Sequence, residues 1–438
     1  MPRRLDASAP DFAREFESLV AAKRAADENV DAAASAIVAD VKARGDAALL
    51  EYTARFDRLN LAASGLRLPA ERIEQAMKQA PEKVVAALRL AAKRIAAYHK
   101  RLLPADFDVT DELGIRLGAR WNALDIVGLY VPGGTAAYPS SVLMNAVPAK
   151  VAGVARLVMV VPTPDGKVND LVLAAARIAG VDEIYRVGGA QAVAALAYGT
   201  ATIPKVDKIV GPGNAYVAAA KKIVFGAVGI DLIAGPSEIL VVADGQNDPA
   251  WIAVDLLAQA EHDEAAQSIL ITDDAGFAGK VAAAVENALA RLPRAKIARA
   301  SWEKNGAIVL VRRLEDAPAL VDRLAPEHLE LAVAEPEALA KRIRHAGAIF
   351  LGRHAPEAIG DYVAGPNHVL PTSQSARFSS GLGVLDFMKR TSLIGCDAKG
   401  LAAIGPAAVT LAEAEGLDAH ALSVSIRLGD PARSGRRR

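Results

Sequence analysis

The chain has 438 residues, which is enough for about two to four domains. Hydrophobic residues make up 52% of it and charged residues 23%, a globular composition that excludes a mainly disordered chain. The 51 Lys and Arg residues balance the 51 Asp and Glu residues, so charge gives no reason to expect a nucleic-acid or membrane partner.

The single cysteine, Cys396, excludes an internal disulfide, a multi-cysteine zinc site and an iron–sulfur cluster within one chain. Any metal must therefore be held by His, carboxylate and amide groups. The longest apolar stretch, 142–161, is interrupted by Lys150 and Arg156, which argues against a membrane-spanning helix. The residues after Arg4 lack the apolar core of an export signal, so we expect a cytoplasmic protein.

Helical periodicity covers the first hundred residues, and predicts helices at 11–25, 30–56 and 70–103 with a break near Pro81. We interpret His99, near the end of the last helix, as a solvated side chain.

From Asp125 onward, short apolar strands alternate with Ala-rich helices, the pattern of parallel sheets. Two tandem sheets fit this pattern better than one very wide sheet, and the carboxyl ends of their strands are the expected ligand site. After Leu385 the pattern is again mostly helical and ends in a basic tail, 433–438, that we interpret as solvated. The first series of strands is predicted at 126–130, 157–161, 183–187 and 208–210, and the second at 238–242, 268–271, 307–311, 329–333 and 348–351.

Glycine-rich turns follow strands of the first series. Such turns let the backbone approach a phosphate or nucleotide closely, but glycine is also the ordinary residue of strand-to-helix turns. After the turn at Gly211, Asp231 lies 20 residues further on, as in a dinucleotide-binding fingerprint, but Tyr216 occupies the last glycine position. The turns lie at 131–135, 188–191 and 211–214.

Two further patterns each admit two interpretations. Gln259 and His262 are three apart in a predicted helix, so they could hold one metal ion or form a solvated helix end. Glu327 and His328 follow Pro326 at a strand start, where they could act as acid/base groups or be solvated.

Polar residues also occur in a Gly- and Pro-containing apolar loop, which is typical of binding loops. Asp361 and His368 lie in this loop, and His420 lies in the last helical region.

At this point several ordered motifs resemble the histidinol dehydrogenase family, from about residue 10 to residue 430. Together they are far more specific than any one of them. The motifs are GLYVPGG (128–134), GGAQA (188–192), GPGN (211–214), GPSE (235–238), QAEHD (259–263), PEHL (326–329), and GPNHVLPT (365–372) with SGL (380–382).

The resemblance implies an α/β fold of two tandem Rossmann-like parallel-sheet domains with helical N-terminal and C-terminal segments. It also implies a homodimer with shared active sites and one Zn²⁺ per subunit. Such an enzyme oxidises L-histidinol through L-histidinaldehyde to L-histidine, the last steps of histidine biosynthesis, and reduces two NAD molecules. We divide the chain into an N-terminal segment (1–28), a larger domain with the zinc and catalytic residues (29–129 and 237–381), an NAD-binding domain (130–236) and a C-terminal segment (382–438) that reaches the partner's site.

The family's functional residues carry over position by position. The implied acid/base residues are Glu327 and His328. Cys396 lies outside every motif, so a thiohemiacetal route is unsupported, and Gly383 replaces a more usual serine without affecting an implied role. The implied zinc ligands are Gln259, His262, Asp361 and His420 of the partner subunit; the implied substrate contacts are these four with Ser237, His328, His368 and Glu415; the implied NAD contacts are Tyr130, Gln191 and Asn214.

Two other hypotheses remain open from the sequence. The same zinc- and NAD-dependent scaffold could oxidise another polar alcohol, although the retained Ser237, His368 and Glu415 argue against this. The second hypothesis is a non-catalytic two-domain binding protein, and the adjacent Glu327 and His328 argue against it.

Overall fold

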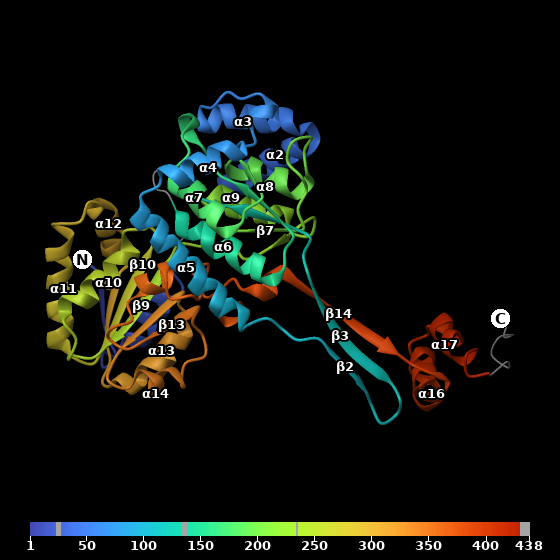
Figure 1. The fold of residues 1–438 in the computed structure, drawn as a ribbon. Coiled ribbons are helices and arrows are strands. Elements are labelled where there is room, and N and C mark those ends of the chain that lie inside the picture. Colours follow the sequence, from blue (N-terminus) through green and yellow to red (C-terminus); the bar gives the residue numbers. More distant parts are fainter. Residues whose placement is uncertain (23–27, 134–137, 234, 430–438) are drawn as a thin grey trace. The chain divides into compact units, whose positions relative to one another are not determined.

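The computed structural model describes residues 1–22, 28–133, 138–233 and 235–429, in two compact units (Figure 1). The end of the first predicted helix, Gly134 of the first motif and the basic tail lie outside these residues. Each unit is assembled from two separate stretches of the chain. The larger consists of Met1–Leu102 and Leu124–Phe387, and the smaller of Leu103–Ala123 and Met388–Arg438.

Sheet A of the larger unit has six parallel strands in the order β1-β11-β10-β9-β12-β13. All strands of the predicted second series are present. An additional edge strand, β1, escapes prediction because only Leu5 of its four residues is buried. The strands are β1 (Arg3–Asp6), β9 (Glu238–Ala243), β10 (Gln267–Thr272), β11 (Ala307–Leu310), β12 (His328–Ala332) and β13 (Ala348–Leu351).

Sheet B has five parallel strands in the order β6-β5-β4-β7-β8, and contains the predicted first series. Numbered along the chain, the five strands of sheet B and β9 to β13 of sheet A both have the order 3-2-1-4-5, as in a Rossmann fold. The predicted tandem Rossmann-like architecture is confirmed. The strands of sheet B are β4 (Ile126–Tyr130), β5 (Arg156–Val160), β6 (Glu183–Tyr185), β7 (Lys208–Val210) and β8 (Gly229–Ile230).

Both faces of sheet A are buried, which is why its strands are continuous apolar runs rather than alternating patterns. Leu240 and Val242 face a core with α1, α13 and α14, whereas Ile239 and Val241 face a core with α10, α11 and α12. The helices of this half are α1 (Phe12–Val20), α10 (Pro249–Ala260), α11 (Ala275–Leu289), α12 (Ala295–Asn305), α13 (Ala317–Leu324), α14 (Pro336–Ala340) and α15 (Glu357–Tyr362).

The remaining helices of the larger unit cover sheet B, where α2 and α3 share a core with α8 and α9. The predicted break near Pro81 is present, but the helix predicted at 30–56 is two helices, because Gly45 (φ +57°) ends the first. These helices are α2 (Glu28–Arg44), α3 (Asp46–Asp57), α4 (Ala70–Gln79), α5 (Glu82–Lys100), α6 (Pro139–Ala152), α7 (Asp170–Ala179), α8 (Gly189–Tyr198) and α9 (Ala215–Val224).

The interpretation of His99 as a solvated side chain is wrong. His99 is 1% exposed, and its Nδ1 donates a hydrogen bond to the Ile95 carbonyl oxygen at 2.9 Å. The ring lies on the packed face of α5, together with Leu88, Ala91 and Ile95.

The smaller unit combines an antiparallel sheet in the order β14-β3-β2 with two helices. The predicted helical character begins only at Ala398, after β14, which escapes prediction because its residues are mostly exposed. Among the residues described, no helix is long and apolar enough to cross a membrane. The elements are β2 (Phe107–Thr110), β3 (Arg116–Ala123), β14 (Met388–Gly395), α16 (Ala398–Ala414) and α17 (Asp418–Ser425).

Candidate active site

The acid/base candidates Glu327 and His328 lie where the chain enters β12. Ala325 has a left-handed backbone (φ +46°) and Pro326 follows it, so the chain is still turning just before these residues. His328 is the first residue of β12 and pairs with Ile239 of β9. Glu327 and His328 therefore lie at the amino end of β12, beside the amino end of β9. The sequence predicted a site at the carboxyl ends of the strands, and these two residues do not lie there.

The carboxyl ends of β9 and β12 are closed by polar contacts of the chain itself. Arg353 Nη2 lies 2.6 Å from the Asp244 carboxylate, and the Asn247 amide donates to the Ala332 carbonyl oxygen at 2.6 Å. The usual crevice of a Rossmann-like sheet is thus occupied by protein groups here.

The backbone of Glu238, the first residue of β9, holds both acid/base candidates. Its N–H donates to the Glu327 carboxylate at 2.9 Å, and its carbonyl oxygen lies 3.0 Å from His328 Nδ1. A carbonyl oxygen can only accept, so Nδ1 carries a proton, and Nε2 is the basic nitrogen whenever the ring is neutral. Nε2 is buried and has no hydrogen-bond partner among the described residues.

Three carboxylates surround the His328 ring. Glu327 and Glu357 each place an oxygen 3.6 Å from Nδ1, and Asp361 places one 3.6 Å from Nε2. Burial alone would lower the pKa of His328. The carboxylates of Glu357, Glu327 and Asp361 outweigh burial and raise this pKa well above its ordinary value. The site therefore stabilises an imidazolium, the form that a catalytic base acquires.

Glu327 and Glu357 are themselves buried, being 6% and 3% exposed. Burial raises the pKa of Glu327 to about 8 and that of Glu357 to about 7, although the His328 charge opposes this in both. Both carboxyl groups can therefore gain or lose a proton near neutral pH.

A second layer of acidic groups lies behind Glu357. The Glu330 carboxylate accepts the Glu357 N–H at 2.5 Å, and it is 4% exposed. Burial and the nearby Asp255 carboxylate raise the pKa of Glu330 well above its ordinary value, and burial raises the pKa of Asp255 to about 6.

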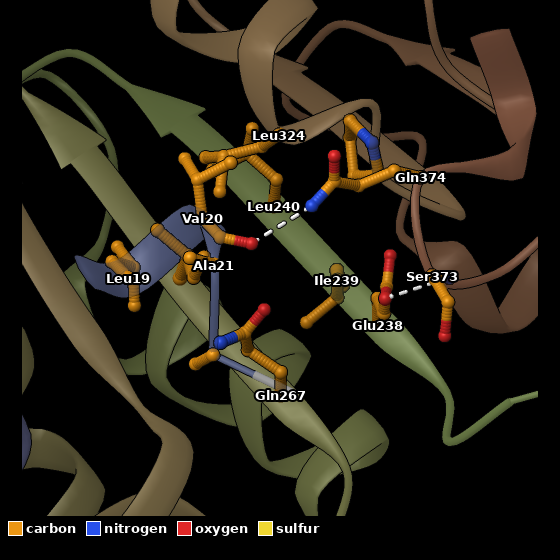
Figure 2. Close-up of a pocket in the computed structure, with 13 residues that line it drawn as sticks. Leu19, Val20, Ala21, Glu238, Ile239, Leu240, Gln267, Leu324, Ser373 and Gln374 are labelled. Carbon is orange, nitrogen blue, oxygen red and sulfur yellow. Dashed lines mark hydrogen bonds between the residues drawn. The ribbon is translucent and has the colours of Figure 1, made fainter. Parts of the chain in front are cut away.

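The side chain of Glu238 lies between the catalytic candidates and a cavity of about 650 Å³. Its carboxylate accepts the Glu327 N–H at 3.3 Å and the Ser373 N–H at 3.0 Å; Figure 2 shows the second bond. Among the described residues, the cavity lining includes Glu238 and Pro326 but neither Glu327 nor His328. Glu238 thus ties β9, β12 and the loop at Ser373 together.

Gln259 is the clearest candidate for a side chain that binds a ligand. It lies in the last turn of α10, its side chain is fully buried, and neither its Oε1 nor its Nε2 has a hydrogen-bond partner in the described part of the chain. Burying both ends of an amide without partners is costly, so the arrangement fits a ligand atom or metal ion at this position.

His262 follows α10, in a turn in which its N–H donates to the Gln259 carbonyl oxygen at 3.1 Å. The ring has an exposed side, and the protein packed around it lowers its pKa, an effect that the Asp361 carboxylate opposes. His262 and Asp361 are therefore within electrostatic range of each other, as a shared metal would require.

Geometry alone also indicates a metal-binding cluster of His328, Glu357 and Asp361, whose candidate ligand atoms lie within 4.8 Å of one another. Glu357 and Asp361 are four residues apart in α15 and project to the same side. Only Asp361 belongs to both this cluster and the ligand set implied by the resemblance.

His368 belongs to the loop after α15. Its Nδ1 donates to the Asp361 carbonyl oxygen at 3.0 Å, and its Nε2 lies 3.4 Å from Ser141 Oγ in the first turn of α6. The Asn367 amide donates to the Met144 carbonyl oxygen of α6 at 2.6 Å. These bonds connect the loop with Asp361 and His368 to the first helix after β4 of sheet B.

The NAD-binding candidates gather at the carboxyl ends of sheet B. Tyr130 ends β4, and its hydroxyl accepts the Gly189 N–H at 3.0 Å, at the start of α8. Gln191 in the same turn is 1% exposed, and its Oε1 has no partner within the described residues. Asn214 caps α9, where its Oδ1 accepts the Val217 N–H at 3.2 Å.

Asp231 does not act as the acidic residue of a dinucleotide fingerprint. Its carboxylate is 1% exposed, pairs with Lys221, and accepts the Gly211 N–H at 2.7 Å. It is therefore committed to the turn of the GPGN motif and not free to bind a ribose.

The last three predicted residues are Ser237, next to Glu238 in the sequence, and Glu415 and His420 near the end of the chain. Ser237 is half-buried just before β9, and its carbonyl oxygen accepts the Gln267 N–H at 3.0 Å. Glu415, at the end of α16, and His420, in α17, are exposed residues of the smaller unit.

Comparison with known proteins agrees with the motifs. The chain matches the family model of histidinol dehydrogenase over residues 20–428. It is 68% identical over 429 residues to the histidinol dehydrogenase of Rhodospirillum rubrum, an alignment that covers 98% of this chain and 99% of the relative. The chain belongs to the histidinol dehydrogenase family.

Other members of the histidinol dehydrogenase family are similarly close. The enzyme of Bradyrhizobium diazoefficiens is 65% identical over 428 residues, which cover 98% of this chain and 99% of the relative. The crystal structure of the enzyme from Elizabethkingia anophelis has a TM-score of 0.93 at 35% identity and covers 98% of each chain.

As a member of this family, the chain is an oxidoreductase that depends on NAD and zinc. It oxidises L-histidinol through L-histidinaldehyde to L-histidine, the last steps of histidine biosynthesis. The resemblance seen in the motifs is confirmed, and the hypothesis of a non-catalytic binding protein is wrong.

Two residues of the candidate site were not predicted from sequence. Glu238 is part of the GPSE motif, but the resemblance implies no role for it, and Glu357 lies in no motif. Glu238 could have been suspected because it begins a fully buried strand, whereas nothing in the sequence indicates that Glu357 lies beside His328.

Proposed function

We propose that both oxidations occur at one centre, where β9 and β12 begin, with His328 and Glu327 as its acid/base groups. The observation that carries this proposal is the 3.0 Å hydrogen bond from His328 Nδ1 to the Glu238 carbonyl oxygen. Because this bond keeps a proton on Nδ1, Nε2 is the nitrogen that gains and loses a proton, and in the neutral ring its lone pair can accept the proton of an alcohol.

In the first oxidation, hydride passes from the carbinol carbon of L-histidinol to NAD, and the hydroxyl proton passes to His328 Nε2. A carbonyl group forms and gives L-histidinaldehyde. The carboxylates of Glu357 and Glu327 near Nδ1, and of Asp361 near Nε2, stabilise the resulting imidazolium.

In the second oxidation, Glu327 accepts a proton from water, whose oxygen adds to the aldehyde carbon. The hydrated aldehyde then gives a hydride to a second NAD and a proton to the site, and L-histidine leaves with its carboxylate. A carboxyl group with a pKa of about 8 can hold the transferred proton near neutral pH.

Zinc would be held by Gln259, His262 and Asp361 together with His420 of the partner subunit. The unpartnered amide of Gln259, and the influence of the Asp361 carboxylate on the pKa of His262, fit this set. When bound, zinc supplies a Lewis acid that can hold the imidazole and amino nitrogens of L-histidinol. We prefer this set to the cluster of His328, Glu357 and Asp361, because a metal on His328 Nε2 would occupy the atom that accepts the proton.

The remaining substrate contacts in this proposal are Ser237, His368 and Glu415 of the partner subunit. His368 is held by Asp361 and Ser141, so its ring has a fixed orientation. The proposed boundary between the NAD-binding domain and the larger domain, between residues 236 and 237, falls directly before Ser237.

NAD would bind at the carboxyl ends of β4 and β7, where the strand order of sheet B reverses. Tyr130, Gln191 and Asn214 lie there. Capping supports this choice of sheet, because α8 has no side-chain cap and α9 has the neutral cap Asn214. In sheet A, by contrast, the helices that follow the first two strands, α10 and α11, are capped by the carboxylates of Asp248 and Asp274, which would repel a pyrophosphate.

The proposal includes a homodimer with shared active sites, located in the cytoplasm, where NAD is available. Supporting the dimer, the smaller unit exposes large apolar side chains that a partner subunit would cover. They include Phe107 (53% exposed), Ile394 (78%), Leu411 (64%) and Ile426 (53%).

Rapid-mixing kinetics test the division of roles between Glu327 and His328. With L-histidinol, Glu327→Gln should retain the first burst of NADH and lose the second, whereas His328→Asn should slow the first by about 10²- to 10⁴-fold. With L-histidinaldehyde, which bypasses the first oxidation, Glu327→Gln should remain slow. Indistinguishable NADH traces for the two variants on both substrates would show that the proposed division is wrong.

A further inference from the structure

The turn that carries Asn214 is held by a buried ion pair. The carboxylate of Asp231, directly after β8, accepts the Gly211 N–H at 2.7 Å, and the ammonium of Lys221 in α9 donates to the Gly211 carbonyl oxygen at 3.0 Å. Lys221 and Asp231 also bond to each other. Both polar backbone groups of Gly211 are thus bound by the two members of one ion pair.

This pair is removed from water and placed at the ligand edge of the sheet. The side chains of Lys221 and Asp231 are 3% and 1% exposed. Gly211 has a φ of +110°, and a Cβ on it would lie 2.1 Å from the Tyr130 carbonyl oxygen. The turn therefore packs directly on Tyr130, in a conformation that glycine adopts readily and other residues do not.

We infer that Lys221 and Asp231 are positioning residues for NAD, which fix the turn of Gly211 between Tyr130 and Asn214. The inference rests on the proposed NAD site. The two residues do not need to touch NAD: they hold the backbone that carries Asn214 against the backbone of Tyr130. Because the turn is already ordered before NAD binds, the binding free energy is not reduced by the cost of ordering it. Loss of the pair should therefore weaken NAD binding selectively.

The same sheet offers a control pair of similar chemistry but greater exposure, Lys150 (30% exposed) and Asp182 (42%), away from the proposed NAD site. Lys150 bonds to Asp182 at 2.8 Å, Asp182 accepts the Leu157 N–H at 2.8 Å, and Lys150 lies 3.4 Å from the Ala155 carbonyl oxygen. This pair also links a lysine, an aspartate and two backbone groups, but at the amino ends of β5 and β6.

The test compares double variants, because a single substitution would leave one buried charge unpaired. In Lys221→Met/Asp231→Leu both bonds to Gly211 are lost, so KM and Kd for NAD should rise about tenfold, with kcat and KM for L-histidinol nearly unchanged. Lys221→Gln/Asp231→Asn keeps a donor and an acceptor for Gly211 and should restore most of the NAD affinity. Equilibrium binding of NAD gives a readout that does not depend on turnover.

Several outcomes would overturn the inference. Unchanged NAD affinity in the folded apolar variant would show that the pair has only a structural role. An equal rise in KM for NAD in the control, Lys150→Met/Asp182→Leu, would show a general loosening of the sheet. If the apolar variant does not fold, Lys221→Met/Asp231→Asn is used instead: it loses the ion pair and the bond to the Gly211 carbonyl oxygen but keeps an acceptor for the Gly211 N–H. An unchanged KM for NAD in that variant would also show that the pair has only a structural role.

The test also separates failure of this inference from failure of the proposed NAD site. If Asn214→Ala leaves NAD affinity unchanged, the proposed site itself is wrong. If Asn214→Ala weakens NAD binding and the variants of the ion pair do not, only the positioning role is wrong.

Discussion

The amide of Gln259 is stabilised by nothing that the described residues provide, since both of its polar atoms are buried without partners. Such a side chain should lower stability when its ligand is absent and be essential when the ligand is present. Function and stability therefore make opposite demands on this residue.

We expect Gln259→Leu to lose zinc and activity, while the zinc-free protein becomes more stable by about 1–3 kcal/mol, because the unpartnered amide is replaced by an apolar side chain of similar size. The zinc content of the purified variant measures the first effect, and denaturant-induced unfolding after chelation measures the second. Glu357→Gln is the control and should keep its zinc. Zinc loss in Glu357→Gln but not in Gln259→Leu would favour the cluster of His328, Glu357 and Asp361 instead.

The buried His99 lies outside the candidate active site and allows a test of how burial changes a histidine pKa. Burial lowers its pKa below 6.5, so the folded protein keeps the ring neutral at pH values where the unfolded chain already binds a proton. This contribution to stability is present above the unfolded pKa and is lost as pH falls through the folded pKa.

Wild-type protein should therefore lose more unfolding free energy than His99→Gln between about pH 7.5 and 5.5. Glutamine can still donate to the Ile95 carbonyl oxygen but does not titrate in this range. Urea unfolding of both proteins at the two pH values makes the comparison. Equal losses would mean that His99 becomes protonated without unfolding.

At the scale of elements, helix capping distinguishes two sheets that have the same strand order. Asp248 and Asp274 place carboxylates at the starts of α10 and α11, whereas Asn214 places a neutral amide at the start of α9. Aspartate and asparagine cap helices about equally well, so the difference matters for an anionic ligand rather than for the helix.

This reasoning predicts that Asn214→Asp keeps the stability of α9 and weakens NAD binding, because the new carboxylate repels the pyrophosphate. Thermal unfolding should be unchanged, and KM for NAD should rise by about tenfold or more at low salt and by less at high salt. Asp248→Asn, the reverse change in sheet A, should leave KM for NAD unaltered. A KM for Asn214→Asp that equals that of wild type would contradict the placement of NAD.

Elements buried on both faces were predictable from sequence, because β9 and β10 are continuous apolar runs. Strand β14 was not, because most of its side chains are exposed and no apolar pattern marks it. Gly45 inside a predicted helix is a similar case: its positive φ separates α2 from α3, but glycine within a helix does not always end it.

The parts of the candidate site that are formed by sequence neighbours or by single motifs could be predicted from the sequence. Glu327 and His328 are neighbours in sequence, whereas the bond that fixes Glu327 comes from Glu238, 89 residues away, through the pairing of β9 with β12. The carboxylate of Glu357 reaches His328 only because α15 returns to the amino end of β12. Such contacts depend on topology, which local patterns do not specify.

At the scale of the whole molecule, the proposed site takes some of its residues from the smaller unit. His420 and Glu415 lie in this unit, and the other three proposed zinc ligands lie in the larger one. The proposed homodimer would cover the exposed apolar side chains in the sheet and helices of the smaller unit. An active site completed by a second copy of the chain would explain both the position of His420 and Glu415 and the exposed apolar side chains. Mixing inactive subunits tests this hypothesis directly.

His420→Ala and Gln259→Ala should each be inactive, but mixed subunits should regain about a quarter of the wild-type activity. Random exchange makes half of the dimers heterodimers, and each heterodimer restores one of its two sites. Mixing Gln259→Ala with Asp361→Ala should restore nothing, because both ligands come from the same subunit and every site then lacks one. If heterodimers of His420→Ala and Gln259→Ala form, as mass spectrometry can establish, and remain inactive, then His420 acts within its own chain and the shared site is wrong.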